Sequence, residues 1–353
     1  MELERLKKLY NLLANDRIRA FALLFAERFN IRKDILRLDT NNMCNIRCIM
    51  CSTNKTNKAM IMPLDDFKKI IDRFKNTTRL LYLSCGYEPF VTPKFEQYIT
   101  YAKSQGVPFI SFATNLILLT DDLIKCVVDN QVNEIIVSIN GYTKEDYNRI
   151  MCRADFEKLI NNLQKLNEYK KQKKSKFPSI RINTIIMKSN LLEFDNLIKL
   201  VDDFDIDYIS FRPFWVYSEQ NNPVENENEL ISHIPADRLQ EIIQKILFQV
   251  NLFKEKGKSI IIPNSLLAGH AVDCISSNSD KKKSCSIPYF TYIIRHDGSI
   301  DICAFDKDAR IGNFFTDNFK VLVKNIKLFR KKALKGKCAI EQCTSNTDSS
   351  SII

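Results

Sequence analysis

Three cysteines stand within eight residues of one another, Cys44, Cys48 and Cys51 in the stretch CNIRCIMC. Thiolates are soft ligands that bind zinc or iron–sulfur clusters. A structural zinc site takes four protein ligands, so three thiols leave it one short. A cubane iron–sulfur cluster held by three thiolates has one iron open to a small molecule. The spacing C-x3-C-x2-C therefore favours an open cluster on one loop, with a zinc knuckle or incidental cysteines as alternatives.

The composition is that of a globular protein, with 353 residues, 45% hydrophobic and 27% charged. No apolar run approaches the roughly 20 residues that cross a bilayer, so we expect no membrane insertion. Eleven cysteines without an export signal predict a reducing, cytoplasmic location. The net charge of +11 allows an anionic partner. The basic run 170–176 is typical of a solvated helix end, so nucleic acid is an unlikely partner.

Short apolar segments alternate with amphipathic helical segments through the first two thirds of the chain. Such alternation predicts parallel strands joined by right-handed crossovers. Six units are fewer than the eight of a closed barrel, so we expect an α/β fold with a partial (β/α)6, TIM-like barrel. The strands are expected at 35–39, 79–84, 108–114, 134–140, 180–187 and 207–214. The cysteine loop follows the first strand, at the edge where parallel α/β folds bind ligands.

The sequence predicts further segments on either side of this core. Residues 1–34 are expected to form a helical extension, and 35–214 the barrel core. Residues 215–275 are interpreted as a linker followed by a helix and a strand that complete the core. Beyond them we expect a small cysteine-bearing domain over 276–343 and a flexible tail over 344–353.

A second cysteine set lies in the C-terminal part. The Asp297–Gly298 pair stands between two apolar runs, which predicts a β-hairpin. That hairpin would bring Cys285 and Cys303 together at its open end, and the stretch CAIEQC would add Cys338 and Cys343. Four thiolates complete either a cluster or a zinc site.

The cysteine motif, its place after the first strand and the β/α order together resemble the radical S-adenosylmethionine (SAM) superfamily. The resemblance implies a [4Fe–4S] cluster on Cys44, Cys48 and Cys51 whose open iron binds the amino and carboxylate groups of SAM. It also implies a flavodoxin- or ferredoxin-type electron donor. One electron then splits SAM, and the resulting 5′-deoxyadenosyl radical abstracts hydrogen from a substrate.

Further motifs at the strand ends resemble the SAM contacts of that family. CGYEP resembles a GGEP-type motif with Tyr87 where a glycine is usual, ATN resembles TNG, and SING resembles SxDG. An arginine on the following helix is expected to pair with the SAM carboxylate, with Arg153 as second choice. The implied SAM contacts are Met50, Gly86, Glu88, Asn115, Ser138, Asn140, Arg149 and Arg212.

The pattern C-x12-G-x4-C from Cys285 to Cys303 resembles the opening of SPASM/twitch domains. With one closing pair, Cys338 and Cys343, the shorter twitch form with a second, auxiliary 4Fe–4S cluster fits best. We therefore expect a radical SAM oxidoreductase that oxidises a sugar or other small molecule. The alternatives are a maturase acting on a peptide or protein, and a zinc-stabilised basic interaction module that is not an enzyme.

Overall fold

The computed structural model describes residues 34–51, 58–84, 86–212, 214, 223–263, 266, 291–303 and 309–334. The expected N-terminal extension before residue 34, the tail, and three cysteines of the second set lie outside these ranges. Those three cysteines are Cys285, Cys338 and Cys343.

Ten strands form one sheet in the order β12-β11-β10-β1-β3-β4-β5-β7-β8-β9. Every neighbouring pair from β10 to β9 is parallel, and the pairs β10–β11 and β11–β12 are antiparallel. The strands are β1 (Asp34–Leu38), β3 (Thr78–Tyr82), β4 (Phe109–Thr114), β5 (Glu134–Ser138), β7 (Ser179–Ile185), β8 (Tyr208–Arg212), β9 (Ser259–Ile261), β10 (Thr291–Ile294), β11 (Ser299–Asp301) and β12 (Arg310–Asn313).

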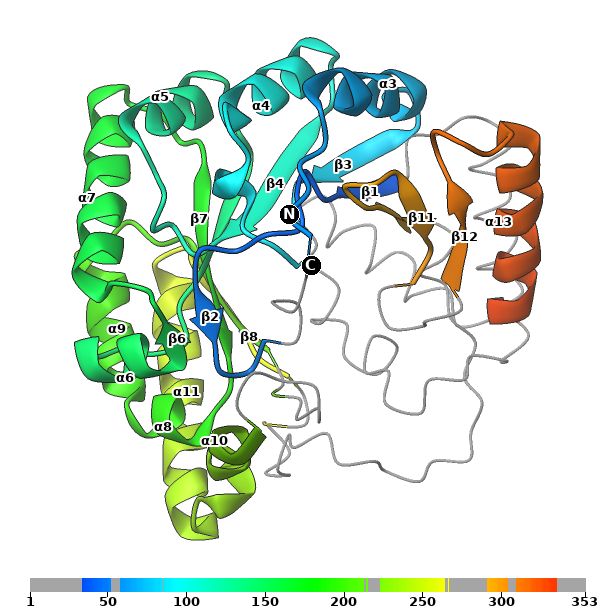
Figure 1. Ribbon diagram of the computed structural model, residues 1–353. Helices are drawn as coiled ribbons and strands as arrows, with labels where there is room; N and C mark the ends of the chain where they lie inside the picture. The colour runs from blue at the N-terminus through cyan, green and yellow to red at the C-terminus, as the bar shows by residue number, and fades with distance from the viewer. Residues whose placement is uncertain are drawn as a thin grey trace.

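Helices α3, α4, α5, α7, α9 and α11 cover one face of this sheet, and α13 lies beside β12 (Figure 1). Short helices α6, α8 and α10 lie near β6 and β8 at one end of the sheet. The helices are α3 (Leu64–Phe74), α4 (Phe95–Ser104), α5 (Asp121–Asp129), α6 (Lys144–Ile150), α7 (Phe156–Gln172), α8 (Lys188–Leu192), α9 (Phe194–Asp203), α10 (Pro223–Asn228), α11 (Ala236–Glu255) and α13 (Phe319–Leu334).

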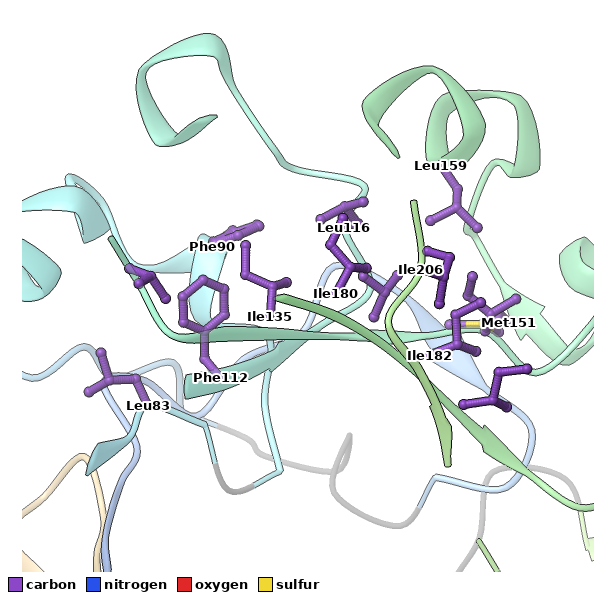
Figure 2. Packing of buried hydrophobic residues seen from close by; sticks show 14 of the residues in the cluster. Leu83, Phe90, Phe112, Leu116, Ile135, Met151, Leu159, Ile180, Ile182 and Ile206 are labelled. Atoms are coloured by element: carbon purple, nitrogen blue, oxygen red, sulfur yellow. The ribbon is translucent and has the colours of Figure 1, made fainter. Parts of the chain in front are cut away.

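The core lies between the sheet and these helices, because alternate strand residues point to opposite faces. Phe112 on β4, Ile135 on β5 and Ile182 on β7 are fully buried on the helix side (Figure 2). Phe112 makes edge-to-face contacts with Phe90 and Phe95, each with ring centroids 5.6 Å apart. Burying one such side chain stabilises the fold by about 1.5–3 kcal/mol.

All six predicted core strands are present, and so is the predicted strand after the 236–255 helix. The sequence favours Thr120 or Asp121 as the N-cap of the helix after β4, and Thr120 is the cap, since its hydroxyl accepts a hydrogen bond from the Leu123 amide at 3.3 Å. The predicted hairpin is also present as β10–β11, with Gly298 at φ +81° in its turn. The hairpin is hydrogen-bonded to the edge of the barrel sheet, parallel to β1, so the sheet continues into the C-terminal part.

Two helices follow β5, α6 and α7, and the short strand β6 (Met151–Cys152) separates them. Arg153 follows β6 with φ +70°, and this left-handed conformation lies at the turn between β6 and α7. Strand β6 pairs with β2 (Arg47–Cys48), which lies inside the cysteine loop. No helix among the described residues is long and apolar enough to cross a membrane.

Candidate active site

The cysteine loop is fixed at its middle by the two-stranded β2–β6 sheet. Cys48 is the register partner of Met151, and Arg47 that of Cys152. The amide of Ile49 donates to the carbonyl of Ile150 at 3.0 Å. A tertiary contact with α6 and β6 therefore holds the second cysteine in place.

The first part of the loop is fixed by Asn41. Its Nδ2 donates to the carbonyl of Glu88 at 2.9 Å and to Oγ1 of Thr92 at 2.8 Å. Its Oδ1 accepts from the amide of Met43 at 2.7 Å. The Glu88 amide in turn donates to the Met43 carbonyl at 3.0 Å. The loop after β1 and the loop after β3 are therefore bonded to each other just before Cys44.

Glu88 is a buried carboxylate that joins three loops. Its Oε1 accepts from Oγ1 of Thr114 at 2.7 Å and from the Phe90 amide at 3.2 Å, and its Oε2 accepts from the Asn115 amide at 2.8 Å. Burial raises the pKa of Glu88 to about 7, while the hydrogen bonds from Asn115, Thr114 and Phe90 lower it. Glu88 thus positions the end of β4 against the cysteine loop.

Asn115 touches the cysteine loop directly. Its Nδ2 donates to Oδ1 of Asn45 at 2.8 Å and lies 3.9 Å from Sγ of Cys44. Its Oδ1 accepts from the Ile117 amide at 3.0 Å, which fixes the orientation of the side-chain amide. The predicted residues Glu88 and Asn115 are therefore brought together with the first cysteine.

The three thiols of the loop are half-buried neighbours. The pKa of Cys44 is raised to about 11, by burial first and by the nearby Glu88 and Cys51 in addition. Burial also raises the pKa of Cys48 well above its ordinary value, with further increases from Cys51, Cys44 and Cys152. Both thiols are consequently protonated at neutral pH without metal, so metal binding releases protons.

The donor set fits an iron–sulfur cluster in its chemistry, because one loop at the carboxyl ends of the strands carries three thiols. Across the described residues, no three histidine, cysteine or carboxylate side chains meet in an arrangement that holds a single metal ion. Of the second cysteine set, only Cys303 is described, half-buried just after β11. An auxiliary cluster on that set stays a prediction.

Ser138 and Asn140 lie where the sequence predicts them, at and after the end of β5. Ser138 is half-buried, whereas Asn140 is buried and its Oδ1 accepts from the Ile185 amide at 2.8 Å. Asn140 therefore ties the β5 loop to β7. The adjacent Gly141 has no room for a side chain, since a Cβ there would lie 2.3 Å from the Tyr147 amide nitrogen.

Two other expected contacts lie on the loops around the cysteines. Met50 is buried in the turn between Cys48 and Cys51. Gly86 is exposed on the loop after β3 and precedes Tyr87, whose ring lies edge-on to that of His296 with centroids 6.4 Å apart. The hairpin turn after β10 therefore borders the same loop.

The arginines predicted to meet SAM differ in their surroundings. Nη2 of Arg149 lies 3.0 Å from Oδ1 of Asp146 and 2.7 Å from Oε1 of Glu229. Arg153 is exposed. Arg212 is at the end of β8, and its Nε donates to Oδ1 of Asn183 at 3.0 Å. Contact of any of them with SAM stays a prediction.

Several residues that fix the site were missed by the sequence analysis. Asn41 and Asn42 precede the first cysteine, and Asn42 holds the far side of the loop by accepting from the Met60 amide at 2.7 Å. Nδ2 of Asn226, on α10, donates to the Ile49 carbonyl at 3.2 Å. The paired asparagines were a readable signal, whereas Asn226 is 177 residues from its partner and gave none.

An open parallel sheet with a three-thiol loop at its strand ends defines a class of metal-cluster α/β enzymes. Residues 39–201 match the model of the Radical SAM superfamily, and this part of the chain is a radical SAM domain. The family implies a [4Fe–4S] cluster and SAM as cofactors.

Curated relatives match the same part of the chain. The tungsten-containing aldehyde ferredoxin oxidoreductase cofactor-modifying protein of Pyrococcus furiosus is 25% identical over 179 residues, 49% of each chain. GTP 3′,8-cyclase of Pasteurella multocida is 24% identical, covering 50% of this chain and 52% of its own. Mycofactocin maturase MftC of Mycobacterium tuberculosis is 23% identical, covering 46% of this chain and 40% of its own. The chain thus spans about half the length of these relatives.

Solved structures share the fold over most of the chain. SuiB of Streptococcus suis bound to S-adenosylmethionine superposes with a TM-score of 0.62 at 13% identity, covering 91% of this chain and 71% of its own. His-tagged anSMEcpe with bound AdoMet superposes with a TM-score of 0.61 at 17% identity, covering 88% of this chain and 84% of its own. The partial-barrel architecture predicted from the sequence is confirmed.

Proposed function

We propose that Cys44, Cys48 and Cys51 would hold the [4Fe–4S] cluster of this radical SAM enzyme, close to the ends of β4 and β5. The observation that carries this proposal is the presence of three half-buried thiols on one loop, which is fixed by the Asn41–Glu88 contact and by β6. When bound, the cluster supplies one electron that cleaves SAM to methionine and a 5′-deoxyadenosyl radical, which abstracts hydrogen from the substrate.

The residues of the chain bind and orient SAM around that loop. Asn115 and Ser138 present an amide and a hydroxyl at adjacent strand ends, which suits the polar groups of methionine and ribose. Glu88 is a positioning residue for Asn115, because its carboxylate accepts a hydrogen bond from the Asn115 backbone amide. Burial of Met50 and of the loop around it limits the access of water to the sulfonium.

The substrate that we favour is a sugar or another small molecule, oxidised with the help of an auxiliary cluster on Cys285, Cys303, Cys338 and Cys343. A cluster there would take the second electron from the substrate radical. The hairpin that precedes Cys303 supports this arrangement. A flavodoxin- or ferredoxin-type protein is the expected electron donor.

A second candidate is modification of a peptide. The relative MftC is named a mycofactocin maturase, and a crystal structure shows SuiB bound to the precursor peptide SuiA. The two candidates separate in one assay: the reconstituted enzyme either consumes a small-molecule substrate or changes the mass of a precursor peptide.

The test of the proposal is anaerobic reconstitution of the wild type and of Cys48→Ala. With dithionite and SAM, the wild type should release 5′-deoxyadenosine. In Cys48→Ala the rate of this release should fall by more than the 10- to 100-fold expected when a residue that only supports a metal ligand is replaced. Cys126→Ala is the matched control, because Cys126 lies on α5 beside the Glu96 carbonyl, away from the loop. Equal rates in the wild type and Cys48→Ala contradict the proposal, and a colourless protein with zinc alone favours the interaction module.

A further inference from the structure

The cysteine loop contains a tight turn between its second and third cysteines. The Cys51 amide donates to the Cys48 carbonyl at 3.1 Å, so these four residues form a β-turn. The peptide group between Ile49 and Met50 is at the centre of this turn. Turns of types I and II differ mainly in the direction of the central peptide group, so the hydrogen bond across the turn does not fix that direction. Another contact has to fix it.

Helices α6 and α10 both bond to Ile49. The Ile49 amide donates to the carbonyl of Ile150, the last residue of α6, at 3.0 Å. The Ile49 carbonyl accepts a hydrogen bond from Nδ2 of Asn226 on α10 at 3.2 Å. Ile49 is 2% exposed and Asn226 is fully buried, so water does not compete for this bond. Asn226 therefore fixes the direction of the central peptide group of the turn.

The α10 segment is bonded to α6 and α8 through Glu229, the residue after α10. Oε1 of Glu229 lies 2.7 Å from Nη2 of Arg149 on α6. Oε2 of Glu229 accepts from the Ser189 amide at 3.0 Å, and the Glu229 carbonyl accepts from the Lys188 amide at 2.8 Å, both at the start of α8. The Glu229 amide donates to the Asn226 carbonyl at 3.2 Å. These contacts join α6, α8 and α10, which lie together at one end of the sheet (Figure 1).

The contacts close into a ring that includes the turn. The ring passes through Ile49, Ile150, the adjacent Arg149, Glu229 and Asn226, and returns to Ile49. Glu229 is 4% exposed, and a buried, charge-assisted hydrogen bond is stronger than an exposed neutral one. The turn is therefore held by a network whose members support one another.

The α10 segment does not belong to the part of the chain that matches the Radical SAM model, which ends at residue 201. It follows the last core strand, β8, and falls within the residues 215–275 that the sequence indicates as a linker with a helix and a strand. Its contacts with the cysteine loop are therefore an addition to the matched domain.

We infer that Asn226 and Glu229 are positioning residues of the cluster site, in which Asn226 fixes the turn that carries Cys48 and Cys51, and Glu229 fixes Arg149 beside it. This inference rests on the proposed function, because it assigns the two residues to the cluster that the loop would hold. Residues that support metal ligands contribute to metal retention, and hydrogen bonds near the sulfurs set the reduction potential of a cluster. Asn226 is expected to affect both properties.

The first test measures how firmly the loop holds its cluster. Wild type and Asn226→Ala are reconstituted anaerobically, and an iron chelator is added in excess. The EPR signal that changes on addition of SAM reports the remaining cluster, so an auxiliary cluster does not contribute. We expect Asn226→Ala to lose this cluster about tenfold faster or more, because replacing a residue that supports metal ligands weakens metal binding 10- to 100-fold. Asn226→Asp keeps the shape of the side chain but has no donor when ionised, and it should behave in the same way.

The second test is the midpoint potential of the same EPR signal in a redox titration. Without Asn226 the direction of the Met50 amide is no longer fixed, so the midpoint potential should shift in Asn226→Ala. A general loss of stability does not produce such a shift.

Asn133→Ala is the matched control. Oδ1 of Asn133 accepts from the Ile110 amide at 2.9 Å, at the amino ends of β4 and β5 and therefore at the opposite end of the strands from the cysteine loop. This variant loses a side-chain bond to the backbone and should keep the iron retention and midpoint potential of the wild type. Circular dichroism and chemical denaturation compare the folding of the two variants.

A double variant tests the ring itself. Glu229→Gln alone should also speed the loss of the cluster. In Asn226→Ala/Glu229→Gln the acceleration should be smaller than the product of the two separate effects, because both substitutions break the same ring. Fully multiplicative effects would contradict the ring.

The inference is overturned if Asn226→Ala loses its cluster no faster than Asn133→Ala, or if its midpoint potential equals that of the wild type. It is also overturned if Asn226→Asp retains the cluster like the wild type, because the shape of the side chain then suffices without a donor. A wild type that shows no cluster responding to SAM contradicts the proposed function instead.

Discussion

The two faces of the central sheet differ in almost every physical property. The face under the helices is apolar and closely packed, with Phe112, Ile135 and Ile182 all fully buried. The opposite, inner face carries Arg181, Glu134 and Ser210, and Nε and Nη1 of Arg181 and Oγ of Ser210 have no hydrogen-bond partner among the described residues. Consecutive residues of one strand thus serve opposite purposes, since Phe112 stabilises the fold and Ser111 beside it bonds to Glu134. The contrast teaches that stability and chemistry are separated by a single residue step along each strand.

The largest effect on stability is expected from the helix side. Phe112→Ala should lower the free energy of unfolding by about 3–5 kcal/mol, because it leaves a cavity beside Phe90 and Phe95. Chemical denaturation monitored by circular dichroism measures this. A decrease in the free energy of unfolding of less than about 1 kcal/mol would contradict the placement of the hydrophobic core on this face.

The next effect concerns the loops at the strand ends, through Glu88. Its pKa is about 7 in the folded protein against 4.5 in the unfolded chain, so between these values the folded state binds more protons. The free energy of unfolding should therefore fall as pH rises from 4.5 to 7, by up to about 3 kcal/mol relative to Glu88→Gln. Denaturation of the cluster-free protein at several pH values, with the exposed Glu145→Gln as control, measures the difference. If the free energy of unfolding of the wild type instead rises with pH relative to that of Glu88→Gln, the pKa of Glu88 is not raised.

A smaller effect is expected one residue from Phe112, on the inner face. Ser111→Ala removes the hydrogen bond to Oε2 of Glu134, which is 3.1 Å long and buried, and should cost about 1 kcal/mol. The same denaturation experiment applies. If Ser111→Ala destabilises as much as Phe112→Ala, the two faces do not differ in the way described.

The smallest change is expected at Arg37. Arg37→Gln should alter the free energy of unfolding by less than about 0.5 kcal/mol, because the guanidinium bonds to no described side chain apart from its contact with the Tyr82 ring. Denaturation of this variant beside Arg238→Gln, which removes the same charge from an exposed ion pair on α11, checks the value. A loss above about 1 kcal/mol would show that Arg37 is a structural residue.

Local patterns predicted much of the fold. The six core strands, the hairpin at Gly298 and the cap at Thr120 depend on alternation, turn residues and capping chemistry, all of which are short-range. Strand β6 and the break between α6 and α7 were not predicted, because two residues form that strand only in the presence of β2, about a hundred residues earlier. The position of the hairpin beside β1 depends in the same way on a distant edge.

The sequence by itself determined the type of chemistry, because three thiols at C-x3-C-x2-C spacing and Glu88 in CGYEP are readable without coordinates. Only the tertiary structure decided which groups meet. It paired Arg149 with Glu229 and bonded Asn226 to the cysteine loop. The physical reason is that strand register and sheet curvature join residues far apart in the chain, and neither is encoded in any short segment.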